Sequence, residues 1–148
     1  MLSRTPAPAP AWCGSARYRG TPDQVSQARG FLARMLGGCP AAGDAILLAS
    51  EICANAVQYS DSRKPGGEFT VYAKACPGSW LWTGIEDEGG TWVKRPRDPG
   101  RMHGLDIVAA LAGDDAWGIV TETGGRLVWF RLGWTGGTVA RRMLATAS

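Results

Sequence analysis

Residues 49–60 read Ala-Ser-Glu-Ile-Cys-Ala-Asn-Ala-Val-Gln-Tyr-Ser. This stretch lies in an apolar run that predicts a mostly buried helix over about residues 41–59. Glu51 and Asn55 are four residues apart, so their side chains share one face of that helix with Asp44 and Gln58. A carboxylate beside a neutral amide is suited to holding a metal-bound nucleotide and activating a hydroxyl. The alternative is a solvated polar stripe.

Length and composition indicate one globular domain. The chain has 148 residues, 45% of them hydrophobic and 20% charged, which is enough for a real core without disulfides or metals. We expect a flexible arm over residues 1–14, a domain over residues 15–135 and a frayed tail over residues 136–148. No apolar run reaches the roughly 18 residues of a membrane helix, and the first residues lack the pattern of a signal peptide. The expectation is a cytoplasmic protein with no membrane role.

Cysteine spacing and charge exclude two further classes. The four cysteines form no CxxC pair and the chain has one histidine, which predicts free thiols and no zinc site. A formal net charge of +3 is too weak to indicate a direct nucleic-acid partner.

The pattern along the chain predicts strand, helix, helix, hairpin, loop, helix, hairpin. Thr21-Pro22-Asp23-Gln24 has the form of a capping box and begins a helix that ends at Gly37-Gly38. Alternation predicts one hairpin from strands near residues 69–74 and 80–86, and another from residues 116–122 and 126–134. A short strand over residues 17–20 and a helix over residues 104–111 complete the set. This order predicts an α+β fold, a two-layer α/β sandwich whose mixed, mostly antiparallel sheet has helices on one face. Tryptophans on the hairpins either pack in the core, which is the commoner fate, or mark a partner surface.

Two further polar groups follow the hairpin. Asp87 and Gly89 come directly after its second strand, and His103-Gly104-Leu105 begins the later helix. Between them, residues 91–102 form a basic loop that is longer than a connection requires. This loop is either a lid over phosphates or a solvated segment.

Taken in this order, the three groups resemble the N, G1 and G2 boxes of the GHKL superfamily of histidine-kinase-like ATPases. The match is closest to the stand-alone anti-sigma factors with serine/threonine kinase activity and the actinobacterial ATP-binding regulators similar to them. It covers about residues 17–134, and includes Gly20-Thr21-Pro22 and Val128-Trp129-Phe130. The resemblance implies a Bergerat-type ATP-binding fold, with ATP and Mg²⁺ as cofactors.

The same resemblance assigns roles to individual residues. Asn55 would coordinate Mg²⁺ through its amide oxygen, and Glu51 would take the proton from water or a protein hydroxyl. Asp87 would accept the amine of adenine, while Gly89 lets the backbone pass close to the base.

The predicted nucleotide-binding set also includes His103, Gly104 and Leu105. Gly104 permits backbone amides to approach phosphate at a helix N-terminus. His103 either contacts phosphate or fills space, and Leu105 also fits a core position. The chain departs from the family pattern at Thr91 and Met102, where glycines are common. It departs again at Leu127, where a threonine near adenine is common.

The implied function is that of an anti-sigma factor-like kinase. Such a protein phosphorylates a serine or threonine of an anti-anti-sigma (STAS-type) partner and also sequesters a sigma factor. The alternative is a non-catalytic nucleotide-binding interaction module that controls a transcription regulator. The oligomeric state, including a homodimer, stays open.

Overall fold

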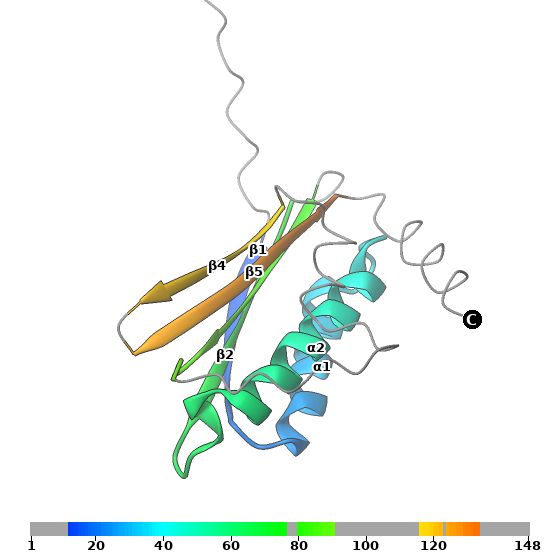
Figure 1. Cartoon of the computed structure of the whole chain (residues 1–148). Helices are drawn as coiled ribbons and strands as arrows, with labels where there is room; N and C mark the ends of the chain where they lie inside the picture. The colour runs from blue at the N-terminus through cyan, green and yellow to red at the C-terminus, as the bar shows by residue number, and fades with distance from the viewer. Residues whose placement is uncertain (1–11, 77–79, 91–115, 123, 134–148) are drawn as a thin grey trace, which may run out of the picture.

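The computed structural model describes residues 12–76, 80–90, 116–122 and 124–133 (Figure 1). The elements in chain order are β1 (Trp12–Arg19), α1 (Asp23–Leu36), α2 (Ala42–Tyr59), the 3-10 helix η1 (Asp61–Arg63), β2 (Glu68–Cys76), β3 (Trp80–Asp87), β4 (Trp117–Glu122) and β5 (Gly125–Gly133). The five strands form one sheet in the order β1-β2-β3-β5-β4, and α1 and α2 cover one of its faces (Figure 1). The predicted α+β sandwich is therefore confirmed.

Every strand pair that the structure describes is antiparallel, so the described sheet has no parallel part. Both predicted hairpins are present, β2 with β3 and β4 with β5. Two details differ from expectation. The first strand begins at Trp12 rather than near Arg17. The side-chain amide of Gln24 donates to the Asp23 carboxylate at 3.2 Å instead of reaching back to Thr21, and only the main-chain amide of Gln24 bonds the Thr21 carbonyl. The basic loop and the helix expected over residues 104–111 lie outside the described residues.

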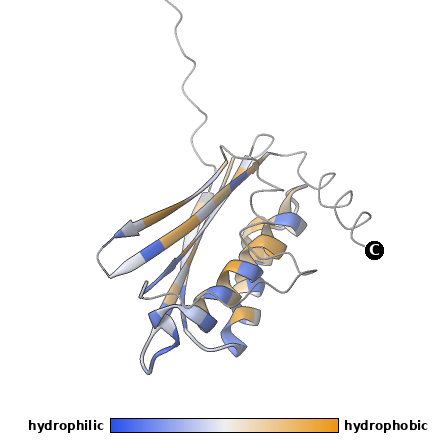
Figure 2. Cartoon of the chain, viewed as in Figure 1, coloured by the Kyte–Doolittle hydropathy of each residue, from blue (hydrophilic) through white to orange (hydrophobic). Residues whose placement is uncertain are grey.

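The core lies between the helices and the sheet. Alternate residues of β2, including Phe69, Val71 and Ala73, point toward the helices and are fully buried. They meet the buried side of α2, where Leu48 and Ile52 lie. Burying each large aliphatic side chain contributes about 1.5–3 kcal/mol. The apolar stretches of β4 and β5 are orange in Figure 2.

The tryptophans of β3 and β5 do not lie in this core, contrary to the commoner expectation. Trp82 and Trp129 occupy the face of the sheet turned away from α1 and α2, here called the outer face, and both are half-buried. Trp82 lies over Gly84, and a Cβ at Gly84 would come within 2.6 Å of its ring. The ring of Trp129 lies over Gly118 in the same way, with Nε1 at 2.8 Å from that position. Each indole thus shields a strand glycine.

All four cysteines are free thiols, as expected. Burial raises the pKa of Cys53 to about 12, which keeps this thiol protonated and unreactive near neutral pH. Within the described ranges, no helix has the length and apolar character needed to cross a membrane.

Candidate functional site

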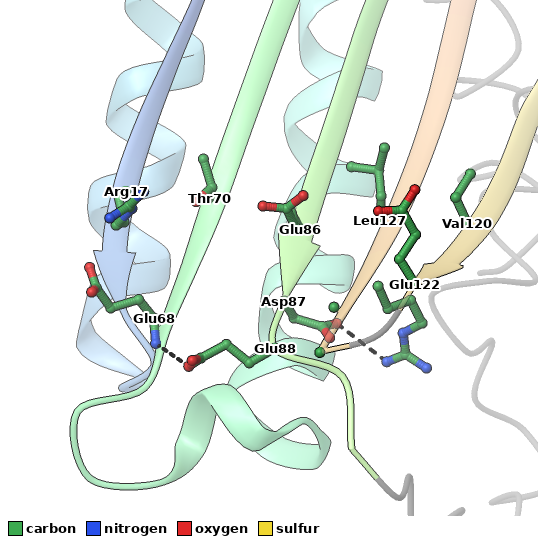
Figure 3. Close-up of a pocket in the computed structure, with 12 residues that line it drawn as sticks. Arg17, Glu68, Thr70, Glu86, Asp87, Glu88, Val120, Glu122 and Leu127 are labelled. Carbon is green, nitrogen blue, oxygen red and sulfur yellow. Dashed lines mark hydrogen bonds and ion pairs between the residues drawn. The ribbon is translucent and has the colours of Figure 1, made fainter.

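Asp87 ends β3 with its side chain toward the helix layer. It continues the alternation of Thr83 and Ile85, and only 4% of it is exposed. Its Oδ1 accepts a hydrogen bond from the Gly89 amide at 2.7 Å. Its Oδ2 accepts one from Arg126 Nη2 at 3.3 Å, which is one of the dashed lines in Figure 3. Burial raises the pKa of Asp87, although the Gly89 amide and Arg126 both oppose the rise. The result is an oriented carboxylate in a largely dry position.

The backbone after Asp87 turns through two glycines with positive φ, +70° at Gly89 and +93° at Gly90. A side chain at Gly90 would also overlap the carboxylate of Asp61. The carbonyl of Gly89 accepts a hydrogen bond from the Asp61 amide at 2.8 Å. The glycines therefore allow the end of β3 to come against the segment that follows α2.

A buried serine fixes this junction. The Ser62 hydroxyl donates to the Glu68 carbonyl at 2.7 Å and accepts from the Glu88 amide at 3.0 Å, so it joins β2 to the end of β3. The Ser62 amide in turn donates to Ser60 Oγ, which donates to the Ala56 carbonyl in the last turn of α2. The C-terminus of α2 and the residues around Asp87 thus form one hydrogen-bonded unit.

Glu51 and Asn55 lie on α2 and are both partly exposed, one turn apart as predicted. Their flank of the helix differs from that of Ser50, whose hydroxyl accepts a hydrogen bond from Arg29 Nε of α1 at 2.7 Å. At about 100° per residue, Asn55 is roughly 140° around the axis from Ser50. Because α1 packs against β1 and β2 while α2 packs against β3, this flank points away from α1 and toward the β5 side of the sheet.

The structure therefore places two of the predicted groups on neighbouring elements. Asn55 lies one turn before the end of α2. Asp61, in the segment that follows α2, donates its amide hydrogen to the Gly89 carbonyl. No hydrogen bond within the described residues joins Glu51 or Asn55 directly to Asp87. The third predicted group, His103, Gly104 and Leu105, lies outside the described residues.

The polar line expected on α2 is not uniform. Gln58 is exposed, but Asp44 is 5% exposed and its Oδ2 has no hydrogen-bond partner among the described residues. Burial raises the pKa of Asp44. Asp44 therefore lies on the buried side of the helix and not on a solvated stripe.

Leu127 does not take the position expected from the family pattern. It pairs with Glu86 and so lies on the outer face, whereas the residue opposite Asp87 is Arg126. Arg126 and Ser62 were both missed by the sequence analysis. The only signal for Arg126 is the pairing register, which the sequence does not reveal, and a small serine in a loop carries no distinguishing pattern.

The fold and these positions define a class, a two-layer α/β sandwich with a polar helix flank beside a buried carboxylate at a strand end. The sequence matches no protein-family model and no curated protein. Among solved structures, the chain is similar to the RsbU and RsbW domains of Rv1364c from Mycobacterium tuberculosis, with 18% sequence identity and a TM-score of 0.61. The match covers 80% of this chain and 32% of that chain. The likeness shows that the two share a fold, and the chain spans about a third of the length of that neighbour.

Proposed function

We propose that the chain is an ATP- and Mg²⁺-binding regulatory protein that acts as an anti-sigma factor-like serine/threonine kinase on a STAS-type anti-anti-sigma partner. The observation that supports this most is that the two predicted groups, one on α2 and one at the end of β3, lie on elements joined by hydrogen bonds. Glu51 and Asn55 lie on the flank of α2 turned away from α1. Asp87 lies at the end of β3, and the Gly89 carbonyl two residues later is bonded to the Asp61 amide in the segment that follows α2. The fold shared with a solved structure that includes an RsbW domain agrees with the family pattern in the sequence.

The residues present fit a nucleotide at this place. A carboxylate has about four acceptor positions, so Asp87 can accept the amine of adenine in addition to its bonds from Gly89 and Arg126. The positive φ of Gly89 keeps the backbone clear of the base.

The amide oxygen of Asn55 is a suitable ligand for Mg²⁺. The described residues contain no group of three or more His, Cys, Asp or Glu side chains that would hold a metal ion. In the proposal Asn55 is therefore the protein ligand, and phosphates and water fill the remaining positions. Mg²⁺ bound there would neutralise part of the phosphate charge.

Glu51 is the proposed base. It lies one turn before Asn55 on the same flank and is partly exposed, so a hydroxyl of a partner protein has access to it. Glu51 would accept the proton of that serine or threonine hydroxyl as the phosphoryl group is transferred.

The first test is nucleotide binding by calorimetry, with and without Mg²⁺. Asn55→Ala should abolish the Mg²⁺-dependent part of ATP binding because the amide ligand is removed. Gln58→Ala is the matched control, since Gln58 is an exposed amide side chain on the same helix, and it should bind as the parent does. Undiminished binding by Asn55→Ala would refute the assignment.

The second test separates the kinase from its alternative. The protein is incubated with γ-labelled ATP and a STAS-type protein, and phosphate on serine or threonine is measured. Glu51→Gln should keep ATP affinity and lose transfer, and a variant as active as the parent would remove Glu51 as the base. ATP binding by the parent without any transfer would favour the non-catalytic interaction module.

A further inference from the structure

The outer face of the sheet carries a cavity that, among the described residues, shares Asp87 and Arg126 with the candidate site. It has a volume of about 400 Å³ and lies at the end of the sheet where β3 finishes (Figure 3). One row of directly paired residues crosses all five strands there, with Arg17, Thr70, Glu86, Leu127 and Val120 on the same face. Glu51 and Asn55 do not line this cavity.

The cavity is strongly acidic although the whole chain is basic. Five carboxylates and two guanidinium groups line it, a formal net charge of −3, whereas the chain carries +3. Asp87 and Arg126 pair with each other, so the remaining charged residues of the lining are four glutamates and Arg17. Those glutamates are Glu68, Glu86, Glu88 and Glu122, all of them exposed.

Few of these charges are neutralised by other residues that the structure describes. Glu86 accepts a hydrogen bond from the Tyr72 hydroxyl at 3.3 Å, and Glu88 accepts one from the Glu68 amide at 2.8 Å. Among the described residues, none of the four glutamates forms an ion pair. Carboxylates that line one cavity repel one another, so an added cation reduces this repulsion as well as forming new bonds.

Apolar side chains lie beside the carboxylates. Leu127 and Val120 stand next to each other on β5 and β4, and 44% of Val120 is exposed. The next row on the same face contains Tyr72 and Trp129, which are half-buried. Aromatic and aliphatic groups next to a charged cavity are typical of protein interfaces, where one long side chain is buried and its neighbours pack around it.

We propose that the outer face is a docking surface for an extended, arginine-containing segment of a partner protein, with an arginine side chain in the cavity. The guanidinium group presents five N–H donors in a planar fork, which suits several carboxylates better than the point charge of lysine does. Its methylene stem would lie along Leu127 and Val120. A second copy of the chain fits less well, because two acidic cavities would face each other across a two-fold interface. The proposal does not depend on nucleotide binding.

The test uses a fluorescein-labelled octapeptide in which arginine alternates with threonine, so that an extended peptide presents every arginine on one side. Its affinity is measured by anisotropy for the full chain near physiological salt. Combined Glu86→Gln and Glu122→Gln substitutions should weaken binding at least tenfold, and so should replacing each arginine of the peptide by uncharged citrulline. Asp23→Asn, which removes an exposed carboxylate on α1, is the control and should change affinity less than twofold.

A second measurement needs no variant. In amide NMR spectra of the parent, the arginine peptide should shift the signals of Leu127 and Val120 and leave those of α1 in place. Equal binding of the citrulline peptide, shifts confined to the helices, or an equal loss in Asp23→Asn would each overturn the proposal. So would a dimer in sedimentation that dissociates on Glu86→Gln, since the outer face would then be a self-interface.

Discussion

Replacing Arg126 by glutamine tests how the site carboxylate is held. Asp87 is buried and its Oδ2 accepts from Arg126, whose side chain is 16% exposed. Removing one partner of a fully buried ion pair costs about 3–5 kcal/mol. The bond between Arg126 and Asp87 is 3.3 Å long and Arg126 keeps some contact with water, so we expect about 2 kcal/mol at pH 7. For a chain of this size, that lowers the melting temperature by about 4–8 °C.

The direction in which this cost changes with pH follows from the pKa of Asp87. Burial raises the pKa of Asp87 above its unfolded value, so its contribution to stability is fully present below the unfolded pKa and is lost as pH rises through the folded pKa. Arg126 opposes this rise, and without it the folded pKa of Asp87 moves higher still. The cost of Arg126→Gln should therefore be largest at neutral pH and shrink as the pH falls below about 4, where Asp87 becomes protonated in both states.

Urea unfolding followed by circular dichroism at several pH values measures this cost. Arg131→Gln is the matched control, because Arg131 lies on the same strand, is exposed, and points to the outer face. Its cost should stay within about 0.5 kcal/mol at every pH. A pH-independent cost for Arg126→Gln, or one no larger than that of Arg131→Gln, would refute the reasoning.

Three further substitutions probe the frame around the site. Ser62→Ala removes two part-buried hydrogen bonds and should cost about 2 kcal/mol in urea unfolding, with weaker ATP binding because the end of β3 loosens from β2. Asp44→Asn should stabilise the protein by about 1 kcal/mol at pH 7, because burial raises the Asp44 pKa, and the gain should vanish toward pH 4; a gain that persists in acid would contradict this. Gly20→Ala would place a Cβ on the Ser62 carbonyl and should cost about 3 kcal/mol, measured against the exposed Gly43→Ala, whose Cβ has no described atom within 4 Å.

Elements with a strong period were predictable from the sequence. The alternation of Phe69, Val71 and Ala73 gave both the strand and its buried face, and the helical spacing around Ile52 gave α2 to within a residue of each end. The first strand was predicted too short. It alternates small and polar residues, including Gly14 and Ser15, so its early part has no apolar signal.

The site was predictable only as far as local spacing reaches. Glu51 and Asn55 are four residues apart on one helix, so their shared flank follows from geometry. The partner of Asp87 depends on how β3 pairs with β5, and a one-residue slip would put Leu127 in the place of Arg126. Register is a long-range property of the folded sheet, which explains why Leu127 was aligned with the threonine position near adenine although it lies on the outer face.

The register also sets the relation between the two proposed ligands. Glu86 and Asp87 are consecutive on β3 and point to opposite faces, so the arginine segment and the nucleotide would approach the same strand end from opposite sides. The Ser62 hydroxyl bonds the amide of the next residue, Glu88, so both approaches act on one hydrogen-bonded junction. If occupancy of one face moves this junction, ATP must change the affinity for the arginine peptide by the same factor as the peptide changes the affinity for ATP. If the junction is rigid, neither ligand changes the affinity for the other, and the two faces serve as independent binding surfaces.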